Sequence, residues 1–146
     1  EADAAQFSPG RSLCAFDTSL GRMGMQICYD LEFPETSRLL ALDGAQLLCA
    51  GSANMYPYEQ LHTLFVRARA TENHLPFIYA NAVGREAGFH YCGRSMAADA
   101  EGNCLCAGEE QEQLLLAEVT LQEGIRDANL DYLQHRRRDL YRLYSW

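Results

Sequence analysis

The 146 residues are enough for one domain with a hydrophobic core, and 48% of them are apolar. A formal net charge of −8 argues against a nucleic-acid partner, because affinity for phosphate backbones comes from basic residues. No apolar run approaches the roughly 18 residues of a membrane span, and the acidic first residues lack the pattern of a signal peptide, so we expect no membrane partner and a cytoplasmic location.

The counts of lysine and cysteine bear on the chemistry. All twelve residues counted as Lys or Arg are arginine, so the chain has no lysine. The six cysteines are Cys14, Cys28, Cys49, Cys92, Cys104 and Cys106. An even number can indicate a disulfide framework, but two of these lie inside apolar runs, as buried free thiols do, and we expect reduced thiols. The cysteines and histidines match no metal-ligand spacing, so we predict no metal site and no cofactor.

In chain order, the first half of the sequence predicts strands that alternate with helices. Apolar runs bounded by turn residues indicate buried strands, and apolar residues at helical spacing indicate helices with one buried face. The elements that we expect are a loop over 1–12, a strand over 15–17, a turn over 20–22, a strand over 23–29, a helix from Pro34 to Leu42, a strand over 45–50, a loop over 51–54 and a helix over 59–73. The residues expected to face the core are Leu39, Leu40 and Leu42 in the first helix, and Leu61, Leu64, Phe65 and Ala68 in the second.

The second half of the sequence predicts paired strands. The elements that we expect are a strand over 77–83, a hairpin of 93–98 and 103–107 around a turn at 99–102, a strand over 114–119, a helix over 121–134 and an aromatic tail over 141–146. Together these elements define a mixed α/β (α+β) fold, a single domain over 1–146 with helices packed on one face of a sheet.

Cys28 is the clearest candidate for a functional residue. It lies at the end of a predicted buried strand and directly before a predicted helix, which is the geometry of a nucleophile elbow. Proteins of the α/β class bind their ligands at such carboxyl ends of strands. A backbone N–H at this turn, that of Tyr29, can face a developing oxyanion. From these residues alone, the alternative of a buried structural cysteine stays open.

Short motifs along the chain add to this candidate. Residues 24–35 read GMQICYDLEFPE, and the other motifs are FSPG at 7–10, GSAN at 51–54, RATEN at 69–73, NAVG at 81–84, GRS at 93–95 and RRDLY at 137–141. In this combination and order the chain resembles the nitrilase superfamily, the carbon–nitrogen hydrolases. The resemblance covers essentially the whole chain. It is greatest to the R-stereoselective, aliphatic amidase branch, which shares CYD-x-EFPE.

The resemblance implies an αββα sandwich, of which this chain supplies the C-terminal half, and a Glu–Lys–Cys triad with Cys28 as its nucleophile. Cys28 would attack an amide or nitrile carbon, and water would hydrolyse the resulting thioester. In that family the triad glutamate and lysine lie upstream of the motif at 7–10, and this chain has no lysine. We therefore expect part of an amidase-like hydrolase that is inactive alone. The alternatives are a non-catalytic partner subunit or pseudoenzyme that uses the fold for dimerisation, and, within the family, a nitrilase or carbamoyl-amide hydrolase.

Two acidic residues near these motifs are further candidates. Asp3, four residues before Phe7, matches a second acidic residue of many family members, with Glu1 as the alternative match and a solvated loop carboxylate as the other interpretation. Glu32, four residues after Cys28, would attract an amine and repel a carboxylate of the substrate. A local cap or salt bridge is the alternative role for Glu32.

The loop after the second buried strand supplies the remaining candidates. Asn54 and Met55 would line the substrate pocket if that strand ends beside Cys28, and ordinary loop packing is their alternative role. The polar residues Arg69, Glu72 and Asn73 are expected to tie their helix to the sheet by buried hydrogen bonds, because buried charges need partners.

Partners follow from the resemblance and from the composition of the tail. We expect a small-molecule amide substrate and a homodimer or larger homo-oligomer, built through helices and the C-terminal tail. The tail carries Tyr141, Leu143, Tyr144 and Trp146, and exposed apolar patches of that kind usually mark an interface. Folding of the tail back onto its own helix is the alternative.

Overall fold

The computed structural model describes residues 5–121 and 128–141. Its strands are β1 (Phe16–Thr18), β2 (Gly21–Ile27), β3 (Leu47–Ser52), β4 (Phe77–Asn81), β5 (Val83–Glu86), β6 (Phe89–Cys92), β7 (Met96–Ala98) and β8 (Cys104–Ala107). Its helices are the 3-10 turn η1 (Cys28–Glu32), α2 (Pro34–Leu42), α3 (Glu59–Asn73), the 3-10 turn η2 (Ala128–Leu130) and α4 (Arg138–Tyr141). The expectation of a mixed α/β fold is therefore confirmed.

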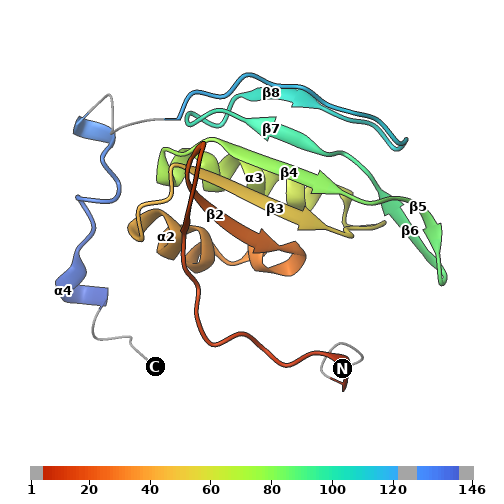
Figure 1. The fold of residues 1–146 in the computed structure, drawn as a ribbon, viewed down its shortest axis with the longest axis horizontal. Coiled ribbons are helices and arrows are strands. Elements are labelled where there is room, and N and C mark those ends of the chain that lie inside the picture. Colours follow the sequence, from red (N-terminus) through yellow and green to blue (C-terminus); the bar gives the residue numbers. More distant parts are fainter. Residues whose placement is uncertain (1–4, 122–127, 142–146) are drawn as a thin grey trace.

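A six-stranded sheet with the strand order β1-β2-β3-β4-β7-β8 forms the centre of the molecule (Figure 1). The neighbours β2, β3 and β4 are parallel, and antiparallel strands flank them on both sides. The register pairs Ile27 with Gly51 and Gly51 with Ala80, so the three parallel strands end at the same edge. Helix α2 connects β2 to β3 and α3 connects β3 to β4, as parallel strands require.

Helices α2 and α3 cover one face of the sheet (Figure 1). Because side chains alternate along a strand, Leu48 and Phe77 point to that face and are fully buried. The opposite face of the same strands carries Met25, Ile27 and Ile78, which are 54%, 69% and 39% exposed. The described part of the chain thus forms a core beneath its helices and leaves the other face of its sheet open.

A close approach of α2 to β2 explains the glycine at position 24. A Cβ placed on Gly24 would lie 2.9 Å from Leu40 Cβ and 3.0 Å from a methyl of Leu48, distances that real Cβ atoms avoid. The missing side chain lets the helix lie directly on the strand.

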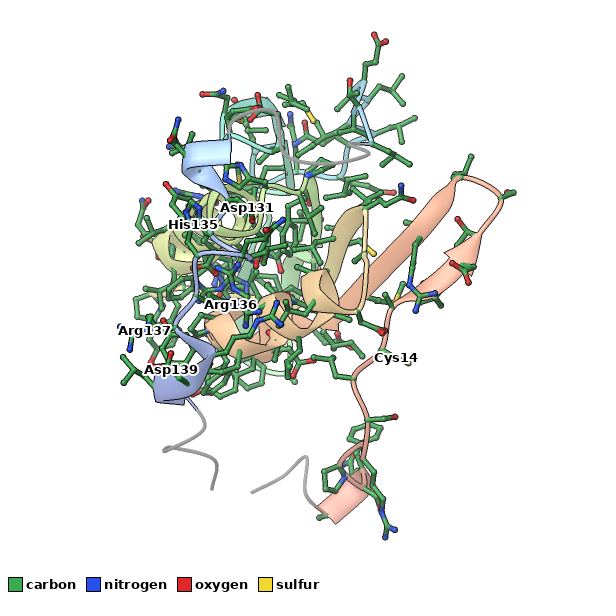
Figure 2. The ribbon with its side chains drawn as sticks, turned by 90° about the vertical axis from the view of Figure 1, so that its left-hand side faces the viewer. Cys14, Asp131, His135, Arg136, Arg137 and Asp139 are labelled. Carbon is green, nitrogen blue, oxygen red and sulfur yellow. The ribbon has the colours of Figure 1, made fainter. Side chains whose placement is uncertain are left out.

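The C-terminal segment adds to the helical side of the molecule (Figure 2). Within it, Leu133 packs against the core and the ring of Tyr132 stacks on His74 at 5.3 Å. Asp131 is 9% exposed, and its side chain accepts a hydrogen bond from the Gln134 amide at 2.8 Å. Among the described residues, no helix has the length and apolar character needed to span a bilayer.

The helix bounds are predicted well, but the buried faces are predicted only in part, since Leu40 is buried and Phe65 packs against the core while four of the predicted residues are exposed. In α2 only Leu40 of the three leucines is buried, and Leu39 and Leu42 are 53% and 41% exposed. In α3 the expected core residues Leu61 and Leu64 are exposed. The residues buried in α3 are His62, Val66, Arg69, Ala70 and Asn73. The error arises because leucines occur around both helices, while three of the buried positions of α3 hold polar side chains that find partners inside.

The predicted hairpin is confirmed as β7 and β8, with a register shift between Ala97 and Ala98. The predicted strand over 77–83 is wrong at its end: β4 stops at Asn81, and Val83 begins a separate hairpin of β5 and β6. That hairpin turns at Ala87 and Gly88, both with positive φ.

The described residues do not form the strand predicted over 114–119 or the helix predicted over 121–134. No strand forms over 114–119, where Leu114 and Leu116 are 85% and 83% exposed, because nothing described here covers them. Of the predicted helix over 121–134, the described part holds only η2 followed by turns. The tail residues 142–146 lie outside the described part of the chain.

Candidate active site

Cys28 lies at the junction of β2 and η1, where the chain leaves the sheet. Its φ is +48°, a left-handed conformation that costs energy for a residue with a Cβ and often marks a functional position. The turn is closed by the Ile27 amide, which donates to the Asp30 carboxylate at 3.1 Å. The sequence therefore ends a buried strand in a strained turn that presents a half-buried thiol.

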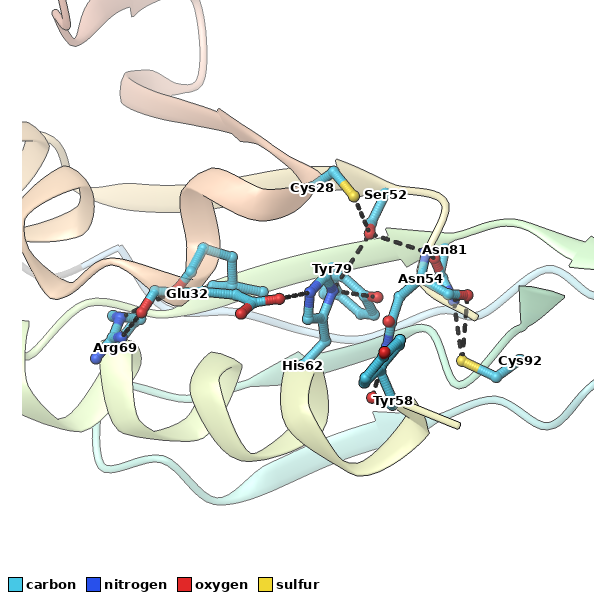
Figure 3. A network of polar contacts seen from close by, with 11 residues as sticks. Cys28, Glu32, Ser52, Asn54, Tyr58, His62, Arg69, Tyr79, Asn81 and Cys92 are labelled. Atoms are coloured by element: carbon cyan, nitrogen blue, oxygen red, sulfur yellow. Dashed lines mark hydrogen bonds and ion pairs between the residues drawn. The ribbon is translucent and has the colours of Figure 1, made fainter. Parts of the chain in front are cut away.

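The carboxyl ends of three parallel strands meet beside this thiol (Figure 3). Cys28 follows β2, Ser52 ends β3 and Asn81 ends β4. The Ser52 hydroxyl donates a hydrogen bond to Cys28 Sγ at 3.3 Å. A donor on the sulfur stabilises the thiolate, the form in which cysteine acts as a nucleophile.

Asn81 fixes the loop that follows β3. Its Oδ1 accepts the Asn54 amide at 2.7 Å, and its Nδ2 donates to the carbonyls of Asn54 at 3.0 Å and Gly93 at 2.7 Å. The Asn54 amide also approaches Ser52 Oγ at 3.2 Å. These bonds hold Ser52 in place from the loop side, so its hydroxyl has a defined position at the sulfur.

His62 of α3 lies beneath Ser52 and is 2% exposed. Its Nδ1 lies 2.9 Å from Tyr79 Oη and 3.2 Å from Ser52 Oγ, and its Nε2 lies 3.2 Å from the Glu32 carboxylate. Burial lowers the pKa of His62 below its ordinary value, against the opposing effect of Glu32. Burial also raises the pKa of Tyr79 well above its ordinary value, with the neighbouring Ser52 side chain acting against it, so the phenol stays protonated.

Arg69 joins α3 to the turn that carries the cysteine. It is 6% exposed, and its guanidinium donates to the carbonyls of Leu31 at 3.2 Å and Glu32 at 2.9 Å. A third bond reaches the Glu72 carboxylate at 3.2 Å. The expectation that Arg69 ties its helix to the sheet is corrected in its target, because the bonds go to η1. Asn73 donates to the Arg69 carbonyl at 2.9 Å, within the same helix.

The predicted site residues Tyr29, Asn54 and Met55 have different contacts in the structure. Tyr29 is 64% exposed, and its ring meets Phe33 edge-on at 5.0 Å, while its amide belongs to the first turn of η1. Asn54 is 7% exposed and its side chain donates to the Tyr58 carbonyl at 3.1 Å. Met55 forms an isolated β-bridge with Tyr91.

Of the predicted acidic site residues, Glu32 lies in the described part of the chain. The Glu32 carboxylate contacts His62, which agrees with the alternative role of a salt bridge, and the Glu32 side chain is 26% exposed. Asp3 and its alternative Glu1 lie outside the described residues.

Ser52, His62 and Tyr79 are not among the site residues predicted from the sequence, although Ser52 lies in the motif at 51–54. The sequence offered a reason to consider Ser52 as a site residue, because Ser52 ends a strand that neighbours the strand before Cys28. For His62 the reason was its helical spacing from Val66 and Arg69, which places the three residues on the same buried face of α3.

Within residues 5–121 and 128–141, neither a cluster of metal ligands nor the hollow described below adds residues to the site around Cys28. In the parts of the chain that the structure describes, no three His, Cys, Asp or Glu side chains gather as metal ligands do. All six cysteines are free thiols. A hollow of about 650 Å³ lies between α3 and β7–β8, where Arg67, Arg94 and Met96 are among its lining residues.

Cys28 has a strained backbone, lies at the carboxyl edge of parallel strands and has a hydroxyl donor on its sulfur. This geometry is typical of a nucleophilic cysteine in an α/β protein. The chain matches the family described as carbon–nitrogen hydrolase over residues 4–128. It is 37% identical over 137 residues to the (R)-stereoselective amidase of a Pseudomonas species, which covers 92% of this chain and 50% of that protein. A Pseudomonas protegens protein described as a hydrolase in the pqqF 5′ region is 40% identical over 121 residues, 82% of this chain and 42% of that protein.

A solved structure gives the same result. A mutant amidase from Nesterenkonia sp. AN1, which shows Michael addition of acrylamide at its active-site cysteine, has a TM-score of 0.86 and 30% identity over 99% of this chain and 54% of its own. The chain therefore belongs to the carbon–nitrogen hydrolase family, which confirms the resemblance seen in the sequence. It spans about half the length of these relatives. Its six-stranded sheet with one helical layer is half of an αββα sandwich of the nitrilase type.

Proposed function

We propose that this chain is the nucleophile-bearing half of an amidase that hydrolyses non-peptide carbon–nitrogen bonds through Cys28. The observation that carries the proposal is the geometry of Cys28, which has φ of +48° at the end of β2 and the Ser52 hydroxyl on its sulfur. The amidases among its relatives support the choice of an amide substrate.

The proposed reaction has two steps. The Cys28 thiolate attacks the amide carbon, a C–S bond forms, and the C–N bond breaks as the leaving amine takes a proton from a general acid. Water then attacks the thioester, loses a proton to the same group acting as a base, and releases the carboxylic acid and the thiol. The resemblance implies a glutamate and an oxyanion-stabilising lysine for these steps. The lysine has to come from outside these residues, since the sequence contains none.

This assignment makes the chain alone a poor catalyst. General acid–base groups and oxyanion donors each contribute orders of magnitude to the rate, and the chain as given lacks the lysine. We expect slow or no amide hydrolysis by the isolated 146 residues, and hydrolysis when the glutamate- and lysine-bearing half is present. Robust turnover by the isolated chain that Cys28→Ala abolishes would contradict the dependence on the other half.

The nucleophile is tested by substitution in the complete hydrolase. Cys28→Ala should abolish ammonia release from a small aliphatic amide and remove the acyl adduct seen by mass spectrometry. Cys14→Ala is the matched control, because Cys14 is exposed and points away from the helical layer (Figure 2), and its activity should equal that of the unmodified protein. Activity that survives Cys28→Ala would reject the proposal in favour of a non-catalytic subunit.

Thiol labelling gives a second, independent test. Burial raises the pKa of the Cys49 and Cys92 thiols, so both should alkylate slowly near neutral pH. We expect Cys28 to be alkylated first among the six thiols when the sites are mapped by mass spectrometry. Faster labelling of Cys14 or Cys92 would count against Cys28 as the activated nucleophile.

Glu32 is proposed as a substrate contact as well as a neighbour of His62. One carboxylate oxygen lies on His62, and the side chain keeps 26% exposure, which leaves room for an amine group of the substrate. In the complete enzyme, Glu32→Gln should reduce turnover of amine-bearing amides more than that of neutral amides. Equal losses on both would assign Glu32 to His62 alone.

A further inference from the structure

A continuous set of polar contacts connects the sulfur to a buried carboxylate–imidazole pair (Figure 3). It runs from Cys28 Sγ to Ser52 Oγ at 3.3 Å, from Ser52 Oγ to His62 Nδ1 at 3.2 Å, and from His62 Nε2 to Glu32 Oε1 at 3.2 Å. The residues come from three different elements, η1, β3 and α3. The proposed two-step reaction assigns no role to His62, although it is a fully buried titratable group.

The chemistry of the partners settles the direction of each hydrogen bond. An ionised carboxylate only accepts, so Glu32 requires the hydrogen of the neutral imidazole to lie on Nε2. His62 Nδ1 is then an acceptor, and the protonated Tyr79 hydroxyl at 2.9 Å is a donor that can fill it. Because Tyr79 occupies His62 Nδ1, the single hydrogen of Ser52 is left for the sulfur of Cys28. The Ser52 oxygen in turn accepts the Asn54 amide at 3.2 Å.

We propose that His62, held by Glu32, is a positioning residue for the nucleophile, which keeps the Ser52 hydroxyl directed at Cys28 Sγ and so stabilises its thiolate. The inference rests on the proposed function, in that Cys28 is taken as the nucleophile. It assigns the half-domain its own device for thiolate formation, separate from the general base that the resemblance implies. His62 does not touch substrate in this scheme. It accepts the Tyr79 hydroxyl hydrogen at Nδ1, and this leaves the Ser52 hydrogen for the sulfur.

The surrounding charges allow a clean pH experiment. The titratable and charged groups on the elements that pack here include Asp30 and Glu32 on η1, His62 and Arg69 on α3, Tyr79 on β4 and Cys92 on β6. The Asp30 carboxylate is engaged with the Ile27 amide, and Tyr79 stays protonated. A change in the pH profile of Cys28 alkylation therefore reports on the Ser52–His62–Glu32 contacts when those residues are substituted.

The test measures the rate of Cys28 alkylation by iodoacetamide against pH in the full chain, with the labelled site mapped by mass spectrometry. Loss of one hydrogen bond to the thiolate in Ser52→Ala should move the midpoint of the curve up by about one pH unit, a tenfold change worth about 1.4 kcal/mol. The rate at neutral pH should fall by only about threefold, because a more basic thiolate is intrinsically more nucleophilic. Ser52→Thr keeps the hydroxyl and should stay near the original midpoint, as should Ser19→Ala at an exposed serine.

The role of His62 is read from non-additivity. His62→Phe keeps the ring volume and should shift the midpoint in the same direction as Ser52→Ala, while the double variant should shift no further than Ser52→Ala alone. Additive shifts, or an unmoved midpoint in a folded His62→Phe protein, would overturn the proposal. If His62→Phe does not fold, Glu32→Gln decides, with an upward shift in support and an unmoved midpoint against. Alkylation does not depend on amide turnover, so failure of the proposed function would appear separately, as activity retained by Cys28→Ala.

Discussion

On the helical face of the central sheet, Leu48 and Phe77 are fully buried beneath α2 and α3, whereas on the opposite face Met25 and Ile27 are 54% and 69% exposed. Both sets of side chains come from strands of the same sheet, which alternate between its two faces. The polar groups at the carboxyl edge follow the same division, because His62 and Arg69 of α3 have their partners on this side, in Tyr79 of β4 and in the backbone of η1. The comparison indicates that the helical face supplies the stability and the thiol geometry, and that the other face of the sheet is exposed in the described part of the chain.

The largest expected difference between the faces comes from two adjacent leucines of α2. Leu40→Ala removes a fully buried side chain and should lower the free energy of unfolding by about 2–5 kcal/mol. Leu39→Ala, at a side chain that is 53% exposed, should change it by less than about 0.5 kcal/mol. Urea unfolding of the two variants measures both values, and equal costs would show that the helix is rotated from the orientation described here.

The next effect concerns the buried guanidinium of Arg69. Arg69→Met keeps much of the side-chain volume but leaves the carbonyls of Leu31 and Glu32 without their donor, which should cost about 1–3 kcal/mol. Arg85→Met, at an exposed arginine of β5, is the control and should be neutral within about 0.5 kcal/mol. Chemical denaturation monitored by circular dichroism gives both numbers. A neutral Arg69→Met would remove the argument that this residue fixes η1.

A smaller effect should appear in the dependence of stability on pH. Burial lowers the pKa of His62 in the folded protein, so the unfolded chain binds the proton more tightly. Stability from this group is fully present above its ordinary pKa of about 6.5 and is lost as the pH falls below that value, by at most about 1.4 kcal/mol per pH unit. Urea midpoints at pH 7.5 and 5.5 should therefore fall more steeply for the unmodified protein than for His62→Phe. Parallel falls would mean that His62 is not the source.

The smallest effect on stability is expected on the open face. Met25→Ser should change the free energy of unfolding by less than about 0.5 kcal/mol, because the side chain is already in contact with water. The same change should weaken self-association or docking of another layer, measured as a lower sedimentation coefficient at micromolar concentration. A cost in stability as large as that of Leu40→Ala would mean that the Met25 face is covered within this chain.

The sequence predicted what depends on local signals. The bounds of α2 and α3 follow from Pro34, from Gly44 and from helical spacing, and β2 and β3 follow from apolar runs bounded by turns. The buried face of α2 was predicted only in part because Leu39, Leu40 and Leu42 are chemically alike, and the sequence does not show that Leu40 is the one that lies against Gly24.

The site was predicted only in part, because some of its residues have local signals in the sequence and others do not. Cys28 stands out locally, at a strand end before a helix, and the family resemblance adds a role for it. Ser52 and His62 are 24 and 34 residues further along the chain, and they meet Cys28 and Glu32 only through the register of β2 with β3 and the packing of α3. The roles of Tyr29, Glu32, Asn54 and Met55 in binding and catalysis stay predictions.

Arg69 and His62 have a consequence for how the thiol moves. Arg69 holds the backbone of η1, while His62 holds the Glu32 side chain of the same turn, and the two residues lie about 10 Å apart along the axis of α3. Two attachment points at that separation prevent η1 from swivelling about either one. Thermal displacement of α3 relative to the sheet should therefore carry η1 and the imidazole together, so that the nucleophile and its support vibrate as one rigid body.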